Sequence, residues 1–481
     1  MKREIQVDVA ILGAGTAGLT ARRSAEQAGA TAVLIDPGPY GTTCARIGCM
    51  PSKLLIAAAD AAYHVRHAAV FGVHAAEPRI DGREVMKRVQ ALRDLFAGSV
   101  VESIEAIDAQ GKLIRGRGQL IDRNTIEVDG HTRVTARSII IATGSSPITP
   151  QPFRGLPAER VLTNDQIFEL EELPESLYVV GAGVIGLELG QAFHRLGVRV
   201  RVGGLRGGVG PLRDPKVLAV AKEVFSGELD IMFDQAAPTA VRMVEGGVEV
   251  TAVDEQGRAR TDVYEKVLSA AGRVPNVRGF GLEVLDLPVD AQGVPLHNHN
   301  TMQVGDTNIF LAGDISAHLP LLHEAADEGR IAGANAAQWP AVLSQPRTTP
   351  LAVAFTDPNI AVVGRPWDTM QCDTFRVGTV DYGKQGRARA MAANRGIVNI
   401  YGEVGTGLLV GAEMFGPGVE HTAHLLAWAI QSRMTVEQAL GMPFYHPVLE
   451  EGIRAALREL QTQLKRAHKA GDPCSEFGPG T

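Results

Sequence analysis

The sequence predicts an α/β fold with two Rossmann-like dinucleotide-binding domains, followed by an α+β C-terminal domain. The first observation is an internal repeat, because residues 7–36 and 177–204 each read as strand, glycine-rich turn, helix and second strand. The second is that residues 351–465 carry strands and two amphipathic helices without a further fingerprint of this kind. Together they indicate two nucleotide-binding units and a separate C-terminal part.

The glycines of the two repeats have the same spacing. The first copy has Gly13, Gly15 and Gly18, and the second has the matching Gly181, Gly183 and Gly186. In such a turn the first glycine permits the sharp bend, the second lets the backbone approach a pyrophosphate, and the third brings helix close to strand. The helix N-terminus then offers unpaired N–H groups to the anion. Both copies are therefore predicted to bind a dinucleotide.

The two repeats differ where their second strand ends. The first ends at Asp36, which is well placed to accept hydrogen bonds from an adenosine ribose. The equivalent residue of the second repeat is Gly204, and Arg206 follows in a glycine-rich stretch. An arginine there suits a 2′-phosphate, so the sequence leaves the choice between NAD and NADP open at this site.

Composition excludes several classes of function. The chain of 481 residues has 47 basic and 54 acidic side chains, a net charge of −7, which gives no support to nucleic-acid binding. No stretch approaches the ~20 apolar residues of a membrane span, and charged residues and glycines interrupt the apolar N-terminus, which is read as a first strand. Four cysteines are too few for an extracellular disulfide framework. A cytoplasmic protein without membrane or nucleic-acid partners is expected.

Cys44 and Cys49 are five residues apart, in a segment of small residues before a helical run over 54–65. Zinc-binding cysteine pairs are usually closer, about two to four apart, and no second pair follows, so no metal site is predicted. The spacing suits a redox-active disulfide at a helix N-terminus, where the helix dipole favours a thiolate.

Near the other end of the chain, His446 precedes Pro447, which predicts a helix start with Glu450 and Glu451 in its first turn. A histidine with a carboxylate partner can take a proton from a thiol and return it. Glu450 and Glu451 are the two candidates for that partner.

In combination, these motifs resemble the pyridine nucleotide-disulfide oxidoreductases of class I, and among them most closely the dihydrolipoamide dehydrogenases. The resemblance covers residues 5 to about 460. It rests on the two fingerprints and on five segments that occur in family order: GTTCARIGCMPSK at 41–53, IATG at 141–144, GRVPN at 272–276, GD at 313–314 and HPVLEE at 446–451.

The resemblance implies FAD on the first unit, a nicotinamide cofactor on the second, and a C-terminal domain that forms a homodimer. By motif position, the implied FAD-binding residues are Gly13, Gly15, Gly18, Asp36, Gly144 and Asp314. The implied nicotinamide-binding residues are Gly181, Gly183, Gly186 and Gly272.

Catalytic roles are also implied by the resemblance alone. Cys49 is expected to lie under the flavin and Cys44 to exchange with substrate. Lys53 is expected beside the flavin, paired with Glu188. His446, oriented by Glu451, is expected to act as acid and base toward Cys44 of the other subunit.

The expected enzyme oxidises dihydrolipoamide, carried by a lipoylated protein, with NAD⁺. A glutathione- or mercuric-reductase-like enzyme using NADPH is one alternative. A flavin transhydrogenase or diaphorase is another, as is a non-catalytic redox sensor. For the mercuric- and thioredoxin-reductase-like alternatives a second C-terminal cysteine pair is required, and only Cys474 lies there. Glycine at both Gly186 and Gly190 favours NAD, while the absence of an acid at Gly204 points the other way.

The chain departs from the family pattern in its cysteine segment and beside the histidine. Thr42 replaces a glycine, Arg46 places a cation between the two cysteines, and Val448 replaces a threonine. The expected domains are an FAD-binding domain over 1–150, a nicotinamide-binding domain over 151–272, a central domain over 273–348, an interface domain over 349–465 and a flexible tail over 466–481.

Overall fold

A computed structural model describes residues 3–204, 207–234, 238–253 and 257–470. The chain forms two compact units, each built from three stretches of sequence. The first unit comprises residues 1–54, 87–148 and 272–348, and the second comprises residues 55–86, 149–271 and 349–481. Two long helices, α3 (Cys49–His67) and α4 (Gly82–Ala109), begin in one unit and end in the other.

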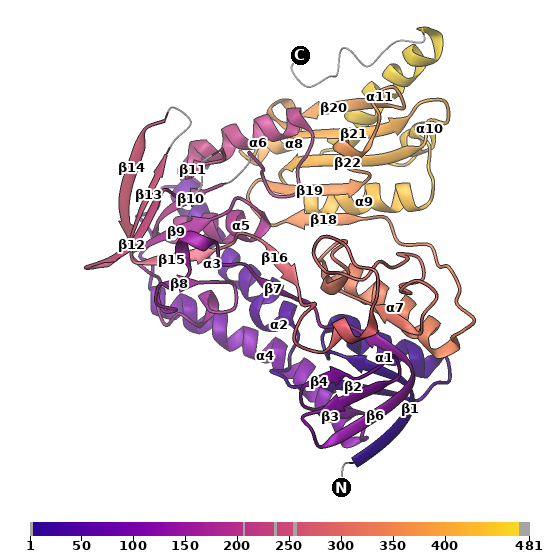
Figure 1. Cartoon of the computed structure of the whole chain (residues 1–481). Helices are drawn as coiled ribbons and strands as arrows, with labels where there is room; N and C mark the ends of the chain where they lie inside the picture. Colours follow the sequence, from indigo (N-terminus) through magenta and orange to yellow (C-terminus); the bar gives the residue numbers. More distant parts are fainter. Residues whose placement is uncertain (1–2, 205–206, 235–237, 254–256, 471–481) are drawn as a thin grey trace. The chain divides into compact units, whose positions relative to one another are not determined.

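The first unit is built on a sheet in the order β3-β2-β1-β6-β5-β4, with β17 also pairing β6 (Figure 1). Strands β1, β2, β3, β6 and β17 run parallel to one another, whereas β5 pairs antiparallel with both β6 and β4. A two-stranded ladder joins β7 to β16. The strands are β1 (Arg3–Leu12), β2 (Ala32–Asp36), β3 (Leu113–Arg115), β4 (Gly118–Leu120), β5 (Thr125–Val128), β6 (Thr132–Ile141), β7 (Ser145–Pro147), β16 (Arg273–Pro275) and β17 (Ile309–Leu311).

Helix α1 (Thr16–Gln27) lies against α7 (Leu322–Gln338) in this unit, and α2 (Thr43–Ile47) follows β2. Helices α1 and α7 approach closely because small residues face each other. A Cβ atom on Gly329 would lie 2.3 Å from the Ala17 carbonyl oxygen, and one on Gly333 would lie 2.2 Å from that of Ala21. The helix pair closes the apolar core between itself and the sheet.

The second unit contains a parallel sheet in the order β11-β10-β9-β15-β8 and an antiparallel sheet β12-β13-β14 (Figure 1). The elements are β8 (Val161–Leu162), β9 (Ser176–Val180), α5 (Val184–Arg195), β10 (Arg199–Gly203), α6 (Pro215–Glu228), β11 (Asp230–Met232), β12 (Ala240–Val244), β13 (Gly247–Val253), β14 (Ala259–Tyr264) and β15 (Lys266–Ser269).

The C-terminal part of the second unit is an antiparallel sheet in the order β18-β19-β22-β21-β20 with helices α9 and α11 against it. Its elements are β18 (Leu351–Ala354), β19 (Asn359–Gly364), β20 (Phe375–Asp381), α8 (Gly386–Ala390), β21 (Ile397–Glu403), β22 (Leu409–Gly416), α9 (Val419–Gln431), α10 (Val436–Leu440) and α11 (Glu451–Ala470). The α/β class, with two Rossmann-like parts and an α+β C-terminal part, is as the sequence predicts.

Helix α11 begins later than expected, at Glu451 rather than at Pro447. The Glu451 carboxylate accepts a hydrogen bond from the Val448 N–H at 3.3 Å, which holds the intervening residues in a turn. At its other end the helix reaches Ala470, into the stretch expected to be a tail, and residues 471–481 lie outside the described residues.

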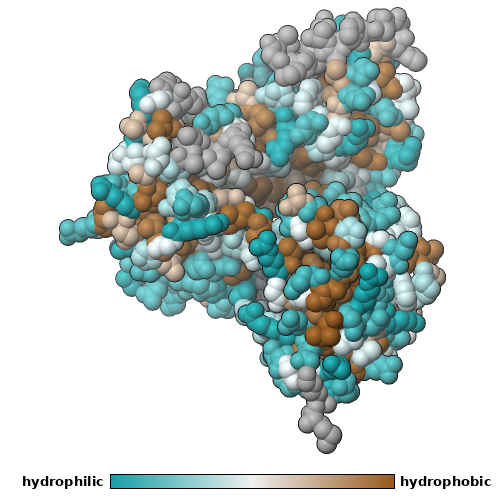
Figure 2. All heavy atoms as spheres, viewed as in Figure 1, coloured by the Kyte–Doolittle hydropathy of each residue, from teal (hydrophilic) through white to brown (hydrophobic). Residues whose placement is uncertain are grey.

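Among the described residues, no helix is both long and apolar enough to cross a membrane. Polar side chains, in teal, are spread over the visible face in Figure 2, with brown apolar patches between them.

Candidate active site and nucleotide sites

The first fingerprint lies where three strands of the first unit end together. Leu12 pairs with Ile141, and Ile141 pairs with Leu311, so β1, β6 and β17 finish at one edge of the sheet. Nucleotides bind at the carboxyl ends of parallel strands in open α/β sheets. This edge brings together the turn at Gly13, the residues through Gly144, and Asp314, which are far apart in sequence.

The fingerprint turn is shaped by its glycines. Gly13 has φ +111°, and a Cβ there would lie 2.3 Å from the Ala142 carbonyl oxygen. A Cβ on Gly18 would lie 2.0 Å from the Gly13 carbonyl oxygen, so α1 can begin only if residue 18 is glycine. By contrast, a Cβ on Gly15 meets nothing within 4 Å. The space beside the start of α1 is therefore open to a phosphate.

Asp36 stabilises this turn through hydrogen bonds to its backbone. Its carboxylate accepts hydrogen bonds from the Ala14 N–H at 2.7 Å and from the Gly38 N–H at 2.6 Å. Each oxygen has a further lone pair, so the carboxylate can also accept from ribose hydroxyls. Glycine cradle and carboxylate together fit the pyrophosphate and ribose of an FAD molecule.

Asp314 and Gly144 are joined through one small network. The Ser145 hydroxyl donates to the Asp314 carboxylate at 2.6 Å and accepts from the Arg273 guanidinium at 2.8 Å. Asn276 binds the Thr143 carbonyl oxygen at 2.9 Å. Sequence reasoning did not single out Ser145, Arg273 or Asn276 as positioning residues, although Arg273 and Asn276 stand inside a segment that it did single out and Ser145 directly follows another.

The two cysteines lie in contact. Cys44 is the second residue of α2, and Cys49 is the first residue of α3, which begins five residues before the expected helical run. Pro51 is tolerated within the first turn because the N–H groups there have no partner within the helix. The structure holds both cysteines as thiols, with Cys44 half-buried and Cys49 exposed.

The Cys49 side chain, through a hydrogen bond, raises the pKa of the Cys44 thiol well above its ordinary value, and burial adds to the shift. The charge of Lys53 acts in the opposite direction. Lys53 donates to the Ser52 hydroxyl at 3.2 Å, and that hydroxyl donates to the Cys49 carbonyl oxygen at 3.1 Å. The arrangement fits a pair that forms a disulfide on oxidation and keeps a proton on Cys44 on reduction.

The second fingerprint repeats the first in the second unit. Val180 pairs with Gly203 and with Ser269, so β9, β10 and β15 end at one edge. Gly181 has φ +109°, a Cβ on Gly186 would lie 1.9 Å from the Gly181 carbonyl oxygen, and a Cβ on Gly183 meets nothing within 4 Å. This turn has the same open space for a pyrophosphate.

Glu188 and Gly272 are two further predicted residues, of which Glu188 lies on α5 of the second unit and Gly272 directly precedes β16 of the first. Glu188 is buried on α5, where its carboxylate accepts the Phe355 N–H at 2.8 Å. Its pairing with Lys53 stays a prediction, because the two residues belong to different units. Gly272 has φ +107° and accepts a hydrogen bond from the Ile148 N–H at 3.0 Å.

His446 and Glu451 form a hydrogen-bonded dyad. The imidazole Nδ1 lies 3.1 Å from both carboxylate oxygens of Glu451, so Glu451 rather than Glu450 contacts the histidine. The hydrogen bond with His446 lowers the pKa of Glu451, and the Val448 N–H lowers it further. The histidine side chain is 80% exposed, so its second ring nitrogen can reach a group on another molecule.

Cys372 is exposed in the loop before β20. Cys474 and Arg206 lie outside the described residues.

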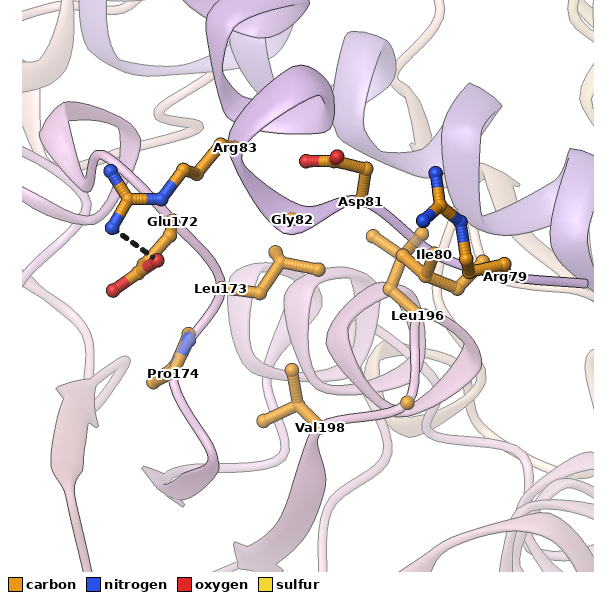
Figure 3. A pocket seen from close by; sticks show the side chains of 11 residues that line it. Arg79, Ile80, Asp81, Gly82, Arg83, Glu172, Leu173, Pro174, Leu196 and Val198 are labelled. Carbon is orange, nitrogen blue, oxygen red and sulfur yellow. Dashed lines mark ion pairs between the residues drawn. The ribbon is translucent and has the colours of Figure 1, made fainter.

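A cavity of about 470 Å³ opens elsewhere in the second unit (Figure 3). Its lining includes Leu196 and Val198 at the C-terminal end of α5, about 18 Å along the helix from the fingerprint turn. Arg83 and Glu172 form an ion pair of 2.9 Å at its edge. No predicted site residue lines this cavity, so it is separate from the fingerprint turn.

Two dinucleotide turns, a contacting thiol pair and a histidine-carboxylate dyad define a flavin-linked disulfide oxidoreductase. Comparison with known proteins agrees: residues 7–329 match the pyridine nucleotide-disulphide oxidoreductase family model, and residues 351–457 match its dimerisation domain. The chain belongs to this family, and it is an oxidoreductase of the class I branch, for which FAD and NAD(P) are the implied cofactors.

Relatives extend over nearly the whole chain. A dihydrolipoyl dehydrogenase of Halobacterium salinarum is 32% identical over 93% of this chain and 95% of its own. A mercuric reductase of Acidithiobacillus ferrooxidans is 30% identical over 96% of this chain and 84% of its own. The crystal structure of LpdA from Mycobacterium tuberculosis has a TM-score of 0.80 at 28% identity, covering 95% of this chain and 99% of that one.

Proposed function

We propose that the chain is a dihydrolipoamide dehydrogenase, which oxidises a dihydrolipoyl group on a carrier protein with NAD⁺. The observation that carries the proposal is the hydrogen-bonded pair of Cys44 on α2 and Cys49 at the start of α3, in the unit that also contains the first fingerprint turn. The dihydrolipoyl dehydrogenases among the relatives support the substrate. Glycine at Gly186 and Gly190 supports NAD.

In the oxidised enzyme, one thiolate of the substrate attacks Cys44 and breaks the disulfide, so that Cys49 leaves as a thiolate. The second substrate thiolate attacks the mixed disulfide, closes the substrate's own disulfide and releases Cys44, which takes up a proton. Bound FAD and nicotinamide supply the acceptors that take this electron pair onward as a hydride equivalent. The raised pKa of Cys44 makes an acid and base necessary at this sulfur.

His446 is the proposed acid and base. Glu451 holds its Nδ1, which leaves Nε2 to exchange a proton with a substrate thiol or with Cys44. The exposed dyad lies beside exposed Tyr445, which is 80% accessible, and in the region that matches the dimerisation domain. We therefore assign it to Cys44 of the partner chain in a homodimer.

The substrate is tested by steady-state rates with NAD⁺ and NADP⁺, each against dihydrolipoamide, and with NADH and NADPH against glutathione disulfide and Hg(II). Dihydrolipoamide with NAD⁺ should give the highest kcat/KM. Faster turnover of Hg(II) or glutathione disulfide with NADPH would assign the chain to one of the alternative reductases.

The shared site is tested by mixing two inactive variants, Cys44→Ser and His446→Gln, and letting the subunits exchange. Half of the dimers become mixed, and each mixed dimer has one intact site, so about a quarter of wild-type dithiol turnover should return. If the dyad served its own chain, neither site of a mixed dimer would be complete and no activity would return.

A further inference from the structure

The nucleotide turn of the second unit leaves little room for a side chain at the usual position of the acid. A Cβ on Gly204 would lie 3.0 Å from the Ala182 side chain, 3.0 Å from the Met232 carbonyl oxygen and 3.1 Å from the Phe233 Cα. The Gly204 N–H also donates to that Met232 oxygen at 2.7 Å. A side chain at residue 204 would therefore require the fingerprint turn or the neighbouring strand end to shift by a few tenths of an ångström.

The same contacts bring the end of β11 next to the turn. Gly203 pairs with Met232 in the parallel ladder, so residue 233 stands beside Gly204, one strand further along the sheet. Adjacent strands are about 4.8 Å apart. Asp234 follows Phe233 in the segment after β11. This acid is therefore about one strand spacing away from residue 204, where the acid of such a fingerprint usually stands.

Asp234 lies over the backbone of the loop that follows β10. A Cβ on Gly207 would lie 2.4 Å from one Asp234 carboxylate oxygen, and the Gly207 N–H donates to the Phe233 carbonyl oxygen at 3.0 Å. The loop then returns to the fingerprint, because the Gly210 N–H donates to the Ala182 carbonyl oxygen at 2.9 Å. Asp234 thus stands at the rim formed by the loop and the fingerprint turn.

Lys222 of α6 fixes the orientation of this carboxylate. Its ammonium group lies 3.0 Å from one Asp234 oxygen, and its charge lies 5.7 Å from the centre of the Phe233 ring. Both ends of the pair are partly exposed. The second carboxylate oxygen faces Gly207, which has no side chain of its own.

We propose that Asp234 is the ribose-binding acid of the nicotinamide site, in place of an acid at residue 204, and that Lys222 is its positioning residue. The proposal rests on the proposed use of a nicotinamide dinucleotide by the second unit. An ionised carboxylate accepts hydrogen bonds from both hydroxyls of an adenosine ribose.

The same geometry makes Asp234 a specificity residue. A 2′-phosphate carries about −1.5 to −2 charges and would meet the carboxylate at close range. Lys222 is already paired with Asp234 and does not offset that second charge in full. The site should therefore favour NAD(H) over NADP(H), although residue 204 has no acid.

Calorimetric titration of the FAD-loaded protein with ADP-ribose and with its 2′-phosphate tests the assignment without turnover. Asp234→Asn should weaken ADP-ribose binding by about tenfold or more, because a charge-assisted acceptor is lost, and should reduce the discrimination against the 2′-phosphate. Lys222→Met should weaken ADP-ribose less, by about threefold, since the carboxylate remains but is less well held.

Asp230→Asn is the matched control, because Asp230 stands at the other end of β11 and pairs with Arg260 at 3.0 Å. It should leave both affinities unchanged. Unchanged ADP-ribose binding in Asp234→Asn, or tighter wild-type binding of the 2′-phosphate that Lys222→Met abolishes, would overturn the proposal.

A second measurement shows separately whether the proposed substrate, dihydrolipoamide, is wrong. Reduction of the bound FAD by dihydrolipoamide, measured in the absence of any nicotinamide, does not involve Asp234. If that reduction fails while the binding results hold, the substrate assignment is wrong and the ribose assignment stands.

Discussion

The two nucleotide turns have nearly the same backbone and different surroundings. Gly13 and Gly181 have φ values of +111° and +109°, and the helices begin after Gly15 and Gly183 with φ values of −76° and −74°. In the first unit an acid ends the second strand and binds the turn, whereas the second unit has Gly204 there. The two turns thus share one backbone shape, and they differ in the side chains available to contact a ribose.

The units also differ in the segment after the second strand. The first continues into the cysteine segment and so combines a nucleotide turn with a thiol pair, while the second continues into the glycine-rich loop that starts at Gly204. In the proposed enzyme, the thiol pair and the turn assigned to the nicotinamide dinucleotide therefore belong to different units.

Breaking the thiol pair should have the largest effect, because it should abolish dithiol turnover and spare the reaction that needs only the nucleotide sites. In Cys44→Ser, turnover of dihydrolipoamide should fall by at least about 10³-fold, because the attacked sulfur is lost. Reduction of ferricyanide by NADH, which needs the nucleotide sites but no disulfide, should stay within about twofold of wild type. Cys44→Ser with wild-type dithiol turnover would contradict the proposed role of this cysteine.

Alanine at the central glycine of each turn should weaken one cofactor only. The added methyl group of Gly15→Ala or Gly183→Ala meets no protein atom and occupies the phosphate space instead. Gly15→Ala should weaken FAD binding by about 10- to 100-fold, and Gly183→Ala should raise the KM for NADH similarly.

FAD retention during gel filtration and NADH saturation curves measure the two effects. Thermal unfolding of the apoproteins is the control, and both variants should match wild type. Loss of both cofactors in either variant would show that the turns are not independent.

An acid at the end of the second strand should matter for cofactor binding in the first unit and should not improve it in the second. Asp36→Ala removes an acceptor for the Ala14 and Gly38 N–H groups and for the ribose, so FAD affinity should fall by about 10-fold or more. Gly204→Glu in the second unit should lower the melting temperature without improving NADH affinity, because its Cβ would lie only 3.0 Å from the Ala182 side chain and from the Met232 carbonyl oxygen. A Gly204→Glu variant with tighter NADH binding and unchanged melting temperature would refute this steric account.

The smallest expected effect concerns pH and a histidine cluster of the first unit. His299 lies 4.7 Å from the ring of His297 and 4.4 Å from that of His318, measured between ring centres. Burial, together with the charges of both histidines and of Arg347, lowers the pKa of His299 to about 4. Between about pH 6.5 and 4, the unfolded chain binds a proton that the folded chain does not.

The free energy of unfolding should therefore fall as pH drops through this window. The loss should be about 1 kcal/mol, well below the full shift, since the exposed part of the ring is screened by solvent. Urea unfolding at pH 7 and pH 5 measures it, and His299→Asn should reduce the difference. An equal pH dependence in His299→Asn would exclude His299 as the cause.

The fold class and both fingerprints could be predicted because a glycine spacing encodes a backbone requirement. A Cβ on Gly18 or Gly186 would lie 2.0 or 1.9 Å from a carbonyl oxygen, so no other residue satisfies either position. The contact between His446 and Glu451 was expected from the resemblance of residues 446–451 to the family motif, whereas local spacing alone left Glu450 and Glu451 as candidates. Motifs that depend on residues close together in the sequence could therefore be predicted.

Features that depend on residues brought together only by the fold could not be predicted from the sequence. Asp234 gains its position from the register of β10 and β11, which no local pattern of the sequence reveals. The start of α11 was wrong by four residues, because a side-chain hydrogen bond rather than Pro447 sets it. The early start of α3 at Cys49 likewise depends on how the preceding segment folds.

The empty space beside Gly15 and Gly183 has a consequence for handling the protein. A ligand that binds there binds the folded chain and not the unfolded one, so it adds stability of about 1.4 kcal/mol for every tenfold excess over its dissociation constant. A purified sample that has lost flavin should therefore melt earlier and recover on addition of FAD. A nicotinamide dinucleotide should add a second, separate increment.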